Sequence, residues 1–293
     1  MTHIYHIPDS TDEHPAWDGA AVTGRARCIR AHNVNAFTVM GTNSWIIIEP
    51  GAQGALVVDP GPPEPAHLDA LVDACTQAGA RVAAIALTHK HADHVEGVPA
   101  FIERVGDVPV YGRAPLGDLM LSDPVNFSYH PLPDGPFTPF PGCPSLEVVS
   151  LPGHASDCVG ILLNDEGSML TGDMIFRDWS TIIVHPDGTL GDYFASLDTL
   201  ATLTRTGTVS LLLTGHGCPI DDPASTIASY AAHRRHRLDT LRQAIAATGS
   251  TDARTLAARL YGHLDASLQE PGVVACEAQL AYLRAIDDPC LSR

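Results

Sequence analysis

Basic residues are scarce in this sequence of 293 residues. Lys and Arg together number 17 against 34 Asp and Glu, which gives a formal net charge of −17 at pH 7. Such a surplus of negative charge repels nucleic acid at long range and works against a surface that follows phosphates. We therefore expect no DNA partner, and we expect a small-molecule substrate rather than RNA.

Long apolar runs are missing as well, although 45% of the residues are hydrophobic. No stretch approaches the roughly 18 uninterrupted apolar residues that a membrane span needs. The opening residues, MTHIYHIPDSTDEHP, lack the basic-then-apolar order of a signal peptide. We expect a globular cytoplasmic protein that makes no membrane contact.

Two further motifs are absent. The seven cysteines are scattered, odd in number and form no C-x-x-C pair, so we expect reduced thiols. No G-x-S-x-G motif marks a serine nucleophile. The chemistry must therefore come from other side chains.

Short apolar runs broken by Gly, Asn and Pro indicate many strands. Strands are expected at residues 36–40, 44–50, 55–61, 82–87, 108–112, 146–151, 159–164, 168–172, 181–188 and 209–213. Helical periodicity is expected at 68–78, 95–106, 192–205 and 223–247, with two more helices in 252–293. The Pro- and Gly-rich residues 131–144 are expected to form a loop. This order predicts two sheets packed face to face and covered by helices.

The order also predicts three parts of the chain. Residues 1–222 would form a metal-binding domain, 223–250 a connecting helix, and 251–293 a small C-terminal helical segment. The last part is too short for a large core of its own.

Histidine and aspartate gather where the predicted strands end. The stretch THKHADHVEG follows strand 82–87, and three further ligand-type residues each follow an apolar strand in a Gly-containing turn. Nitrogen and carboxylate ligands on four loops are enough for two metal ions. The candidate ligands are His89, His91, Asp93, His94, His154, Asp173 and His216. A solvated histidine-rich loop is the alternative for the first cluster, and an ordinary turn residue is the alternative for each of the other three.

The motifs THKHADHVEG, LPGHASD, TGDM and TGHG resemble those of the metallo-β-lactamase fold in order and approximate spacing. The resemblance implies a four-layer αββα sandwich that holds one or two metals at the sheet edges. It implies a first metal on His89, His91 and His154. A second would lie on Asp93, His94 and His216, with Asp173 between the two.

The residues within the motifs resemble those of one branch of this superfamily. Aspartate rather than cysteine at position 173 is similar to the glyoxalase II side. TNSWII, VVDPG, PDGTLGDYFASL and HRRHR are similar to the β-lactamase-like protein 2 group. That group implies a winged-helix-like C-terminal segment, and single-strand endoribonuclease activity as an alternative function.

Two cations that share a water lower its pKa toward 7, and the resulting hydroxide attacks a carbonyl or phosphoryl group. Asp93 is the candidate catalytic residue as well as a ligand, and Cys158 or Cys218 is a less favoured nucleophile. We expect two divalent ions, zinc first, although iron or manganese suits the same ligands.

Other residues are candidates for supporting roles. Asp59 could orient a ligand imidazole or simply cap a turn, and Lys90 is expected to face solvent or cap the following helix. Contact with substrate and plain surface are equally favoured for Arg177, His185 and Tyr193. The basic residues of the long helix are Arg234, Arg235, Arg237 and Arg242. They could bind a carboxylate or phosphate of the substrate, but a solvent-exposed helix face is the preferred interpretation.

The favoured function is a metal-dependent hydrolase that cleaves a small thioester or ester. Three alternatives remain: a single-strand endoribonuclease, a persulfide dioxygenase with one iron, and a non-catalytic metal-binding or regulatory module. The dioxygenase is disfavoured because Asp93, His94 and His216 complete a second metal site.

Overall fold

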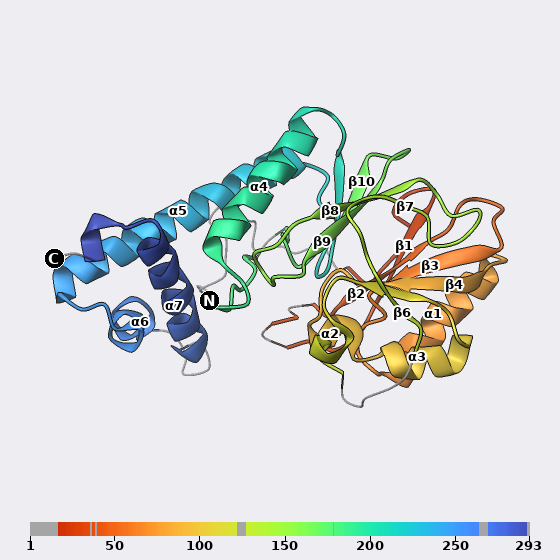
Figure 1. Cartoon of the computed structure of the whole chain (residues 1–293), viewed down its shortest axis with the longest axis horizontal. Coiled ribbons are helices and arrows are strands. Elements are labelled where there is room, and N and C mark those ends of the chain that lie inside the picture. The colour runs from red at the N-terminus through yellow and green to blue at the C-terminus, as the bar shows by residue number, and fades with distance from the viewer. Residues whose placement is uncertain are drawn as a thin grey trace.

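The structure is a computed structural model in which residues 17–35, 37–38, 40–121, 127–177, 179–263 and 269–291 are described. Two sheets and a group of helices divide the molecule into a broad sandwich and a helical extension (Figure 1). No helix in these ranges is long and apolar enough to cross a membrane.

The first sheet has six strands in sequence order. They are β1 (Ala26–Arg30), β2 (Asn43–Ile47), β3 (Gly54–Val58), β4 (Arg81–Ala86), β5 (Val110–Gly112) and β6 (Tyr129–Pro131). The pairs β1–β2 and β2–β3 are antiparallel, whereas β3, β4, β5 and β6 run parallel to one another. The carboxyl ends of β3 and β4 therefore meet at one edge.

The second sheet has five strands in the order β11-β10-β9-β8-β7. Their bounds are β7 (Gly135–Phe137), β8 (Leu146–Ser150), β9 (Val159–Leu163), β10 (Ser168–Gly172) and β11 (Leu211–Thr214). All neighbours are antiparallel except β10 and β11. The parallel pair brings the ends of β10 and β11 to the same place.

Helices cover both outer faces. The first sheet carries α1 (Pro65–Gln77), α2 (Ala92–Val95) and α3 (Val98–Val105), and a 3-10 turn, η1 (Leu116–Asp118), follows β5. The second sheet carries α4 (Leu190–Arg205) and α5 (Pro223–Thr248). The remaining helices are α6 (Ala253–Tyr261), α7 (Gln269–Ala285) and the short η3 (Pro289–Leu291).

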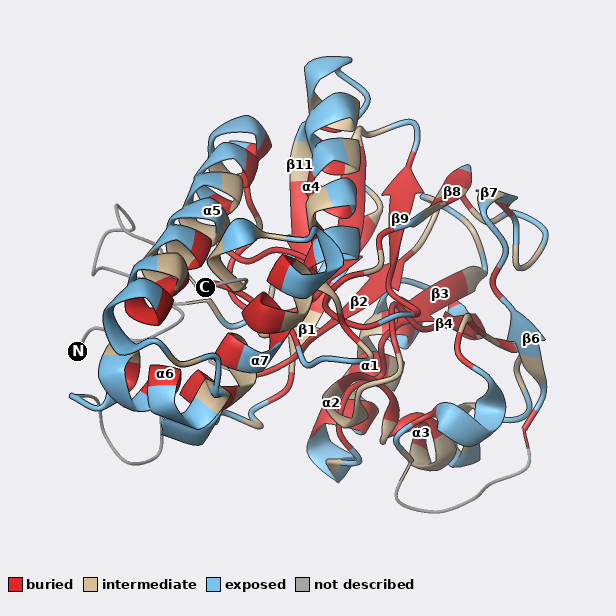
Figure 2. Cartoon of the chain, turned by 60° about the vertical axis from the view of Figure 1, so that its left-hand side comes forward, coloured by how far each residue is buried: buried red, intermediate tan, exposed pale blue. Residues whose placement is uncertain are grey.

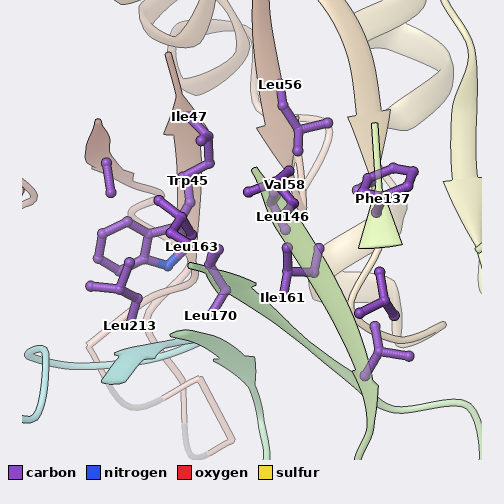
Figure 3. Close-up of a cluster of buried hydrophobic side chains, with 14 of the residues drawn as sticks. Trp45, Ile47, Leu56, Val58, Phe137, Leu146, Ile161, Leu163, Leu170 and Leu213 are labelled. Atoms are coloured by element: carbon purple, nitrogen blue, oxygen red, sulfur yellow. The ribbon is translucent and has the colours of Figure 1, made fainter. Parts of the chain in front are cut away.

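The central strands β2, β3, β9 and β10 are buried on both faces, which is why they appear in the sequence as continuous apolar runs (Figure 2). In β2, Trp45 and Ile47 point between the sheets, and Ile46 points toward the helices of the first sheet. The layer between the sheets joins Leu56 and Val58 to residues of the second sheet (Figure 3). The predicted αββα order of layers is therefore present.

The helical extension has a core of its own. α5, α6 and α7 bury a cluster that includes Leu241, Leu256, Cys276 and Leu283. Asp222 and Asp252 cap α5 and α6 by accepting the backbone N–H of Ser225 and Thr255. All regular secondary structure in the described part of residues 251–293 is helical. The boundaries between the three predicted parts of the chain stay predictions.

The strand expected at residues 36–40 is wrong. Ala36 and Val39 lie outside the described residues, and Phe37, Thr38 and Met40 form turns. The Asn35 side chain accepts the backbone N–H of Phe37 and of Thr38, which favours a turn over an extended chain. The strand that pairs with β2 is β1 instead.

Two other expectations also differ from the structure. Residues 181–188 contain no strand, because the backbone there serves side chains of the site and of α5 rather than a sheet. Residues 131–144 are not loop throughout, since Gly135–Phe137 pairs with β8 as an edge strand.

We expect Leu56→Ala to lower the free energy of unfolding by about 2–5 kcal/mol, because it opens a cavity between the two sheets. Urea unfolding of samples with equal metal content measures the change. Leu116→Ala is the control, since Leu116 is 37% exposed and its loss should cost no more than about 0.5 kcal/mol. Equal effects of the two variants would contradict this account of the core.

Candidate metal centre

Three histidines form the first ligand group. His89 and His91 lie on the turn between β4 and α2, and His154 follows β8. Their ligand atoms lie within 4.8 Å of one another, and His154 Nε2 is 2.9 Å from His91 Nδ1. Three imidazole nitrogens at this spacing suit a cation that they would coordinate together.

Two aspartates and two histidines form the second group. Asp93 and His94 begin α2, Asp173 follows β10, and His216 follows β11. His216 Nε2 lies 3.2 Å from Asp93 Oδ2 and 3.3 Å from Asp173 Oδ2. His94 Nε2 lies 3.2 Å from Asp173 Oδ1. The four ligand atoms are again within 4.8 Å of one another.

Asp173 connects the two groups. Its Oδ2 lies 3.3 Å from His216 Nε2 and 3.6 Å from His154 Nε2, so the same oxygen faces a ligand of each group. This position becomes accessible because Gly215 has no side chain: a Cβ there would lie 2.3 Å from Asp173 Oδ1. The ligands predicted from the sequence thus lie together, in the two groups that the resemblance implies.

Three buried atoms of the site have no hydrogen-bond partner: His89 Nε2, His94 Nε2 and Asp173 Oδ1. Buried polar atoms of native proteins are nearly always bonded. Each of these three atoms is a metal-ligand atom by chemistry, and each points into one of the two groups. The donor set therefore fits divalent metal ions.

The opposite side of each ring is fixed by the protein. His94 Nδ1–H donates to Asp59 Oδ2 at 2.9 Å, and His216 Nδ1–H donates to Gly41 O at 3.0 Å. His154 Nδ1–H donates to Ile182 O at 2.6 Å. Such contacts select the tautomer that leaves Nε2 free for a metal.

Asp59 serves the first group too. It accepts the Thr88 N–H at 2.7 Å and the Thr88 hydroxyl at 2.6 Å, and that hydroxyl lies 3.0 Å from His89 Nδ1. Asp59 is buried and has φ of 52°, a conformation that Asp and Asn tolerate better than most residues. These contacts match an orienting role better than a simple turn cap.

The electrostatics of the two groups differ. Burial lowers the pKa of His91 to about 4 and also lowers the pKa of His89 and His154, so the first group presents neutral imidazoles. Burial lowers the pKa of His216 as well, but Asp173 and Asp93 outweigh it and raise the pKa to about 10. The second group therefore attracts positive charge, which a divalent ion supplies while releasing protons.

The three candidate substrate residues lie in different settings. Tyr193 is fully buried and donates its hydroxyl to Met174 O, so the substrate-contact reading is wrong for it. Arg177 pairs with Asp221. His185 is exposed, on the segment that carries Ile182. The structure therefore leaves only Arg177 and His185 with surface on which to meet a substrate.

Lys90 does not face solvent, contrary to expectation. Its Nζ lies 2.5 Å from Asp187 Oδ1, and Ser156 donates to the same oxygen at 2.6 Å. Neither this contact nor the role of Thr42, whose hydroxyl donates to Asp93 Oδ2 at 3.2 Å, has a clear signal in the sequence. Thr42 opens the TNSWII motif, which is the one hint that it belongs to the site.

We expect Asp59→Asn to weaken metal binding by about 10- to 100-fold, because it removes the charge that orients His94. Asparagine keeps the shape and tolerates the positive φ, so the backbone should persist. Competition with a chelating dye measures the affinity. Asp287→Asn is a matched control at φ of 50° outside the site; a comparable loss in the control would count against the orienting role.

Comparison with known proteins agrees with this geometry. A beta-lactamase-like protein 2 homolog from Caenorhabditis elegans is 27% identical over 240 residues, covering 81% of this chain and 72% of the relative. An atrochrysone carboxyl ACP thioesterase from Pseudocercospora fijiensis is 26% identical over 202 residues, covering 69% of this chain and 55% of that protein.

The fold is matched over nearly the whole chain. The crystal structure of a beta-lactamase domain protein from Burkholderia ambifaria aligns with a TM-score of 0.75 and 20% identity, covering 97% of this chain and 93% of that chain. The sequence profile of the metallo-beta-lactamase superfamily matches residues 37–216, a range that contains every candidate ligand. The chain therefore belongs to the metallo-beta-lactamase superfamily.

Proposed function

We propose that the protein is a binuclear metal-dependent hydrolase that cleaves a small thioester or ester. The observation that carries the proposal is the position of Asp173, whose Oδ2 faces His154 of one ligand group and His216 of the other. A carboxylate shared in this way keeps two cations close enough to act on one water.

The protein's own side chains would prepare the reaction. When bound, the two metal ions would supply a water of lowered pKa and polarise the scissile carbonyl. Asp93 has 27% of its side chain exposed, against 9% for Asp173, so it is the carboxylate that meets incoming solvent. Although burial raises its pKa, His94 and His216 bring it well below the usual range. Asp93 therefore accepts hydrogen bonds and can orient the attacking water.

Exposed apolar side chains favour an acyl substrate. Five of the six large hydrophobic residues with high exposure in the described chain lie on three segments: Val34, Phe37, Leu116, Met120 and Val184. Each segment touches the site through its backbone. Gly41 O accepts from His216, Met120 N–H donates to Lys90 O, and Ile182 O accepts from His154. An apolar rim of this kind suits the hydrocarbon part of a thioester or ester.

The relative named as an ACP thioesterase gives independent support for thioester chemistry. Zinc is the first choice of metal, with iron or manganese as alternatives, because mixed histidine and aspartate ligands accept all three.

An endoribonuclease is the second candidate, because the motifs resemble the β-lactamase-like protein 2 group, a name that one relative carries. The basic helix that would support it is largely engaged within the chain. Arg234 donates to Thr181 O, and Arg242 pairs with Asp239 and Asp288. With a net charge of −17, the protein offers RNA little else.

The test is an assay of metal-loaded protein on acyl-thioesters, lactones and labelled single-stranded RNA. We expect thioester or ester cleavage that Asp173→Asn reduces by at least about 100-fold, because the shared carboxylate is lost. Metal content is measured for both proteins. Cleavage of RNA alone would favour the second candidate, and stoichiometric metal without any turnover would favour a non-catalytic module.

The apolar rim makes a separate prediction about chain length. We expect Phe37→Ser to lower kcat/KM for a long-chain acyl-thioester by about tenfold and to change acetyl-thioester cleavage little, since roughly 1.5 kcal/mol of apolar contact is removed. Ile286→Ser is the control, because Ile286 is 47% exposed but follows α7 in the helical extension and belongs to none of the three segments. Equal losses for short and long chains would rule out an acyl-binding role for Phe37.

A further inference from the structure

A small cavity lies where the helical extension meets the sandwich. Its lining residues come from α5, α7, the end of α6, the start of α4 and the segment that follows Thr181. Figure 1 shows how these helices are arranged. The volume of the cavity is about 30 Å³. A single water needs about 10–15 Å³ on this measure, so the space can take two or three oxygens of a larger ligand group.

The cavity wall contains buried polar atoms that have no hydrogen-bond partner. They include Arg234 Nε on α5, Tyr261 Oη on α6 and Gln279 Oε1 on α7. Tyr261 is 2% exposed and Gln279 is 6% exposed, so bulk solvent does not satisfy them. Leaving such atoms unbonded is costly. The cavity is thus built for a polar occupant.

The charge of the wall indicates an anion. The Arg234 guanidinium lies 4.9 Å above the Tyr193 ring and donates through Nη2 to Thr181 O, which fixes its direction. Among the described residues, no carboxylate lies within ion-pair distance of Arg234. Arg237 lines the same cavity and lies 4.7 Å above the Tyr261 ring. Two oriented guanidinium groups in so small a space favour an oxyanion.

We propose that this cavity binds a carboxylate or phosphate group. Arg234 Nε–H and the Tyr261 hydroxyl donate to the oxyanion, and Gln279 Oε1 accepts from a protonated oxygen or an adjacent N–H of the ligand. The site is separate from the metal centre and does not depend on which bond the enzyme hydrolyses.

The cavity is nevertheless connected to the metal ligands. Arg234 donates to Thr181 O, and the Thr181 hydroxyl lies 3.0 Å from His154 Nδ1. Ile182, which lines the cavity, accepts from the same His154 nitrogen through its carbonyl. An anion that holds Arg234 in place therefore also steadies the segment that orients His154.

Calorimetric titration of the metal-loaded protein with sodium phosphate and with sodium acetate, at constant ionic strength in chloride, tests the proposal. We expect at least one of the two anions to bind saturably at a site that Arg234→Gln weakens by about tenfold or more. Arg235→Gln is the matched control, because Arg235 is the next residue of α5, is exposed and does not line the cavity. Binding of acetate alone identifies a carboxylate site, and binding of phosphate alone a phosphate site.

Two conservative variants keep the test valid if Arg234→Gln fails to fold. Tyr261→Phe removes only the hydroxyl and should weaken the same binding event. Gln279→Glu places a carboxylate in the cavity without changing its shape, and should abolish that event by repulsion. Anion binding at the metal centre should survive both changes. The proposal is overturned if neither anion shows a binding event that these variants alter, or if Arg235→Gln reduces binding as much as Arg234→Gln.

Discussion

The buried carboxylate of Asp173 imposes the constraint on which the rest of the site depends. Its Oδ1 has no hydrogen-bond partner, and its Oδ2 faces both ligand groups. The Asp93 carboxylate lies against the same His216 nitrogen, so two negative charges are held close together. Burying charge is costly unless a counter-charge is held in good geometry. Two divalent cations would satisfy the carboxylates and the open imidazole nitrogens together.

The sandwich makes this arrangement rigid. One ligand cluster comes from the first sheet, while His154, Asp173 and His216 come from the second. The two sheets are tied at the site, because the Asn43 side chain donates to Thr214 O and Gly217 O, and Trp45 Nε1–H donates to Thr214 O. The distance between the two ligand groups is therefore set by the packing of the sheets.

The ligands could be predicted from the sequence because each is a local signal: a histidine or aspartate in a glycine-containing turn after a buried strand. The short apolar runs of strands such as β2, which is buried on both faces, likewise made the two sheets predictable. The outer contacts could not be predicted, since Gly41 and Ile182 act through backbone carbonyls that have no residue signature. The expectations for Tyr193 and Lys90 were wrong for a related reason, because the burial of these side chains depends on partners far away in the chain.

The most direct measurement is anomalous diffraction at the metal absorption edge from crystals of metal-replete protein. For a binuclear centre we expect two peaks about 3.5–4 Å apart. One should lie among His89, His91 and His154, the other among Asp93, His94 and His216, with Asp173 in contact with both. A single peak of full occupancy, with the second ligand group empty, would contradict a binuclear centre.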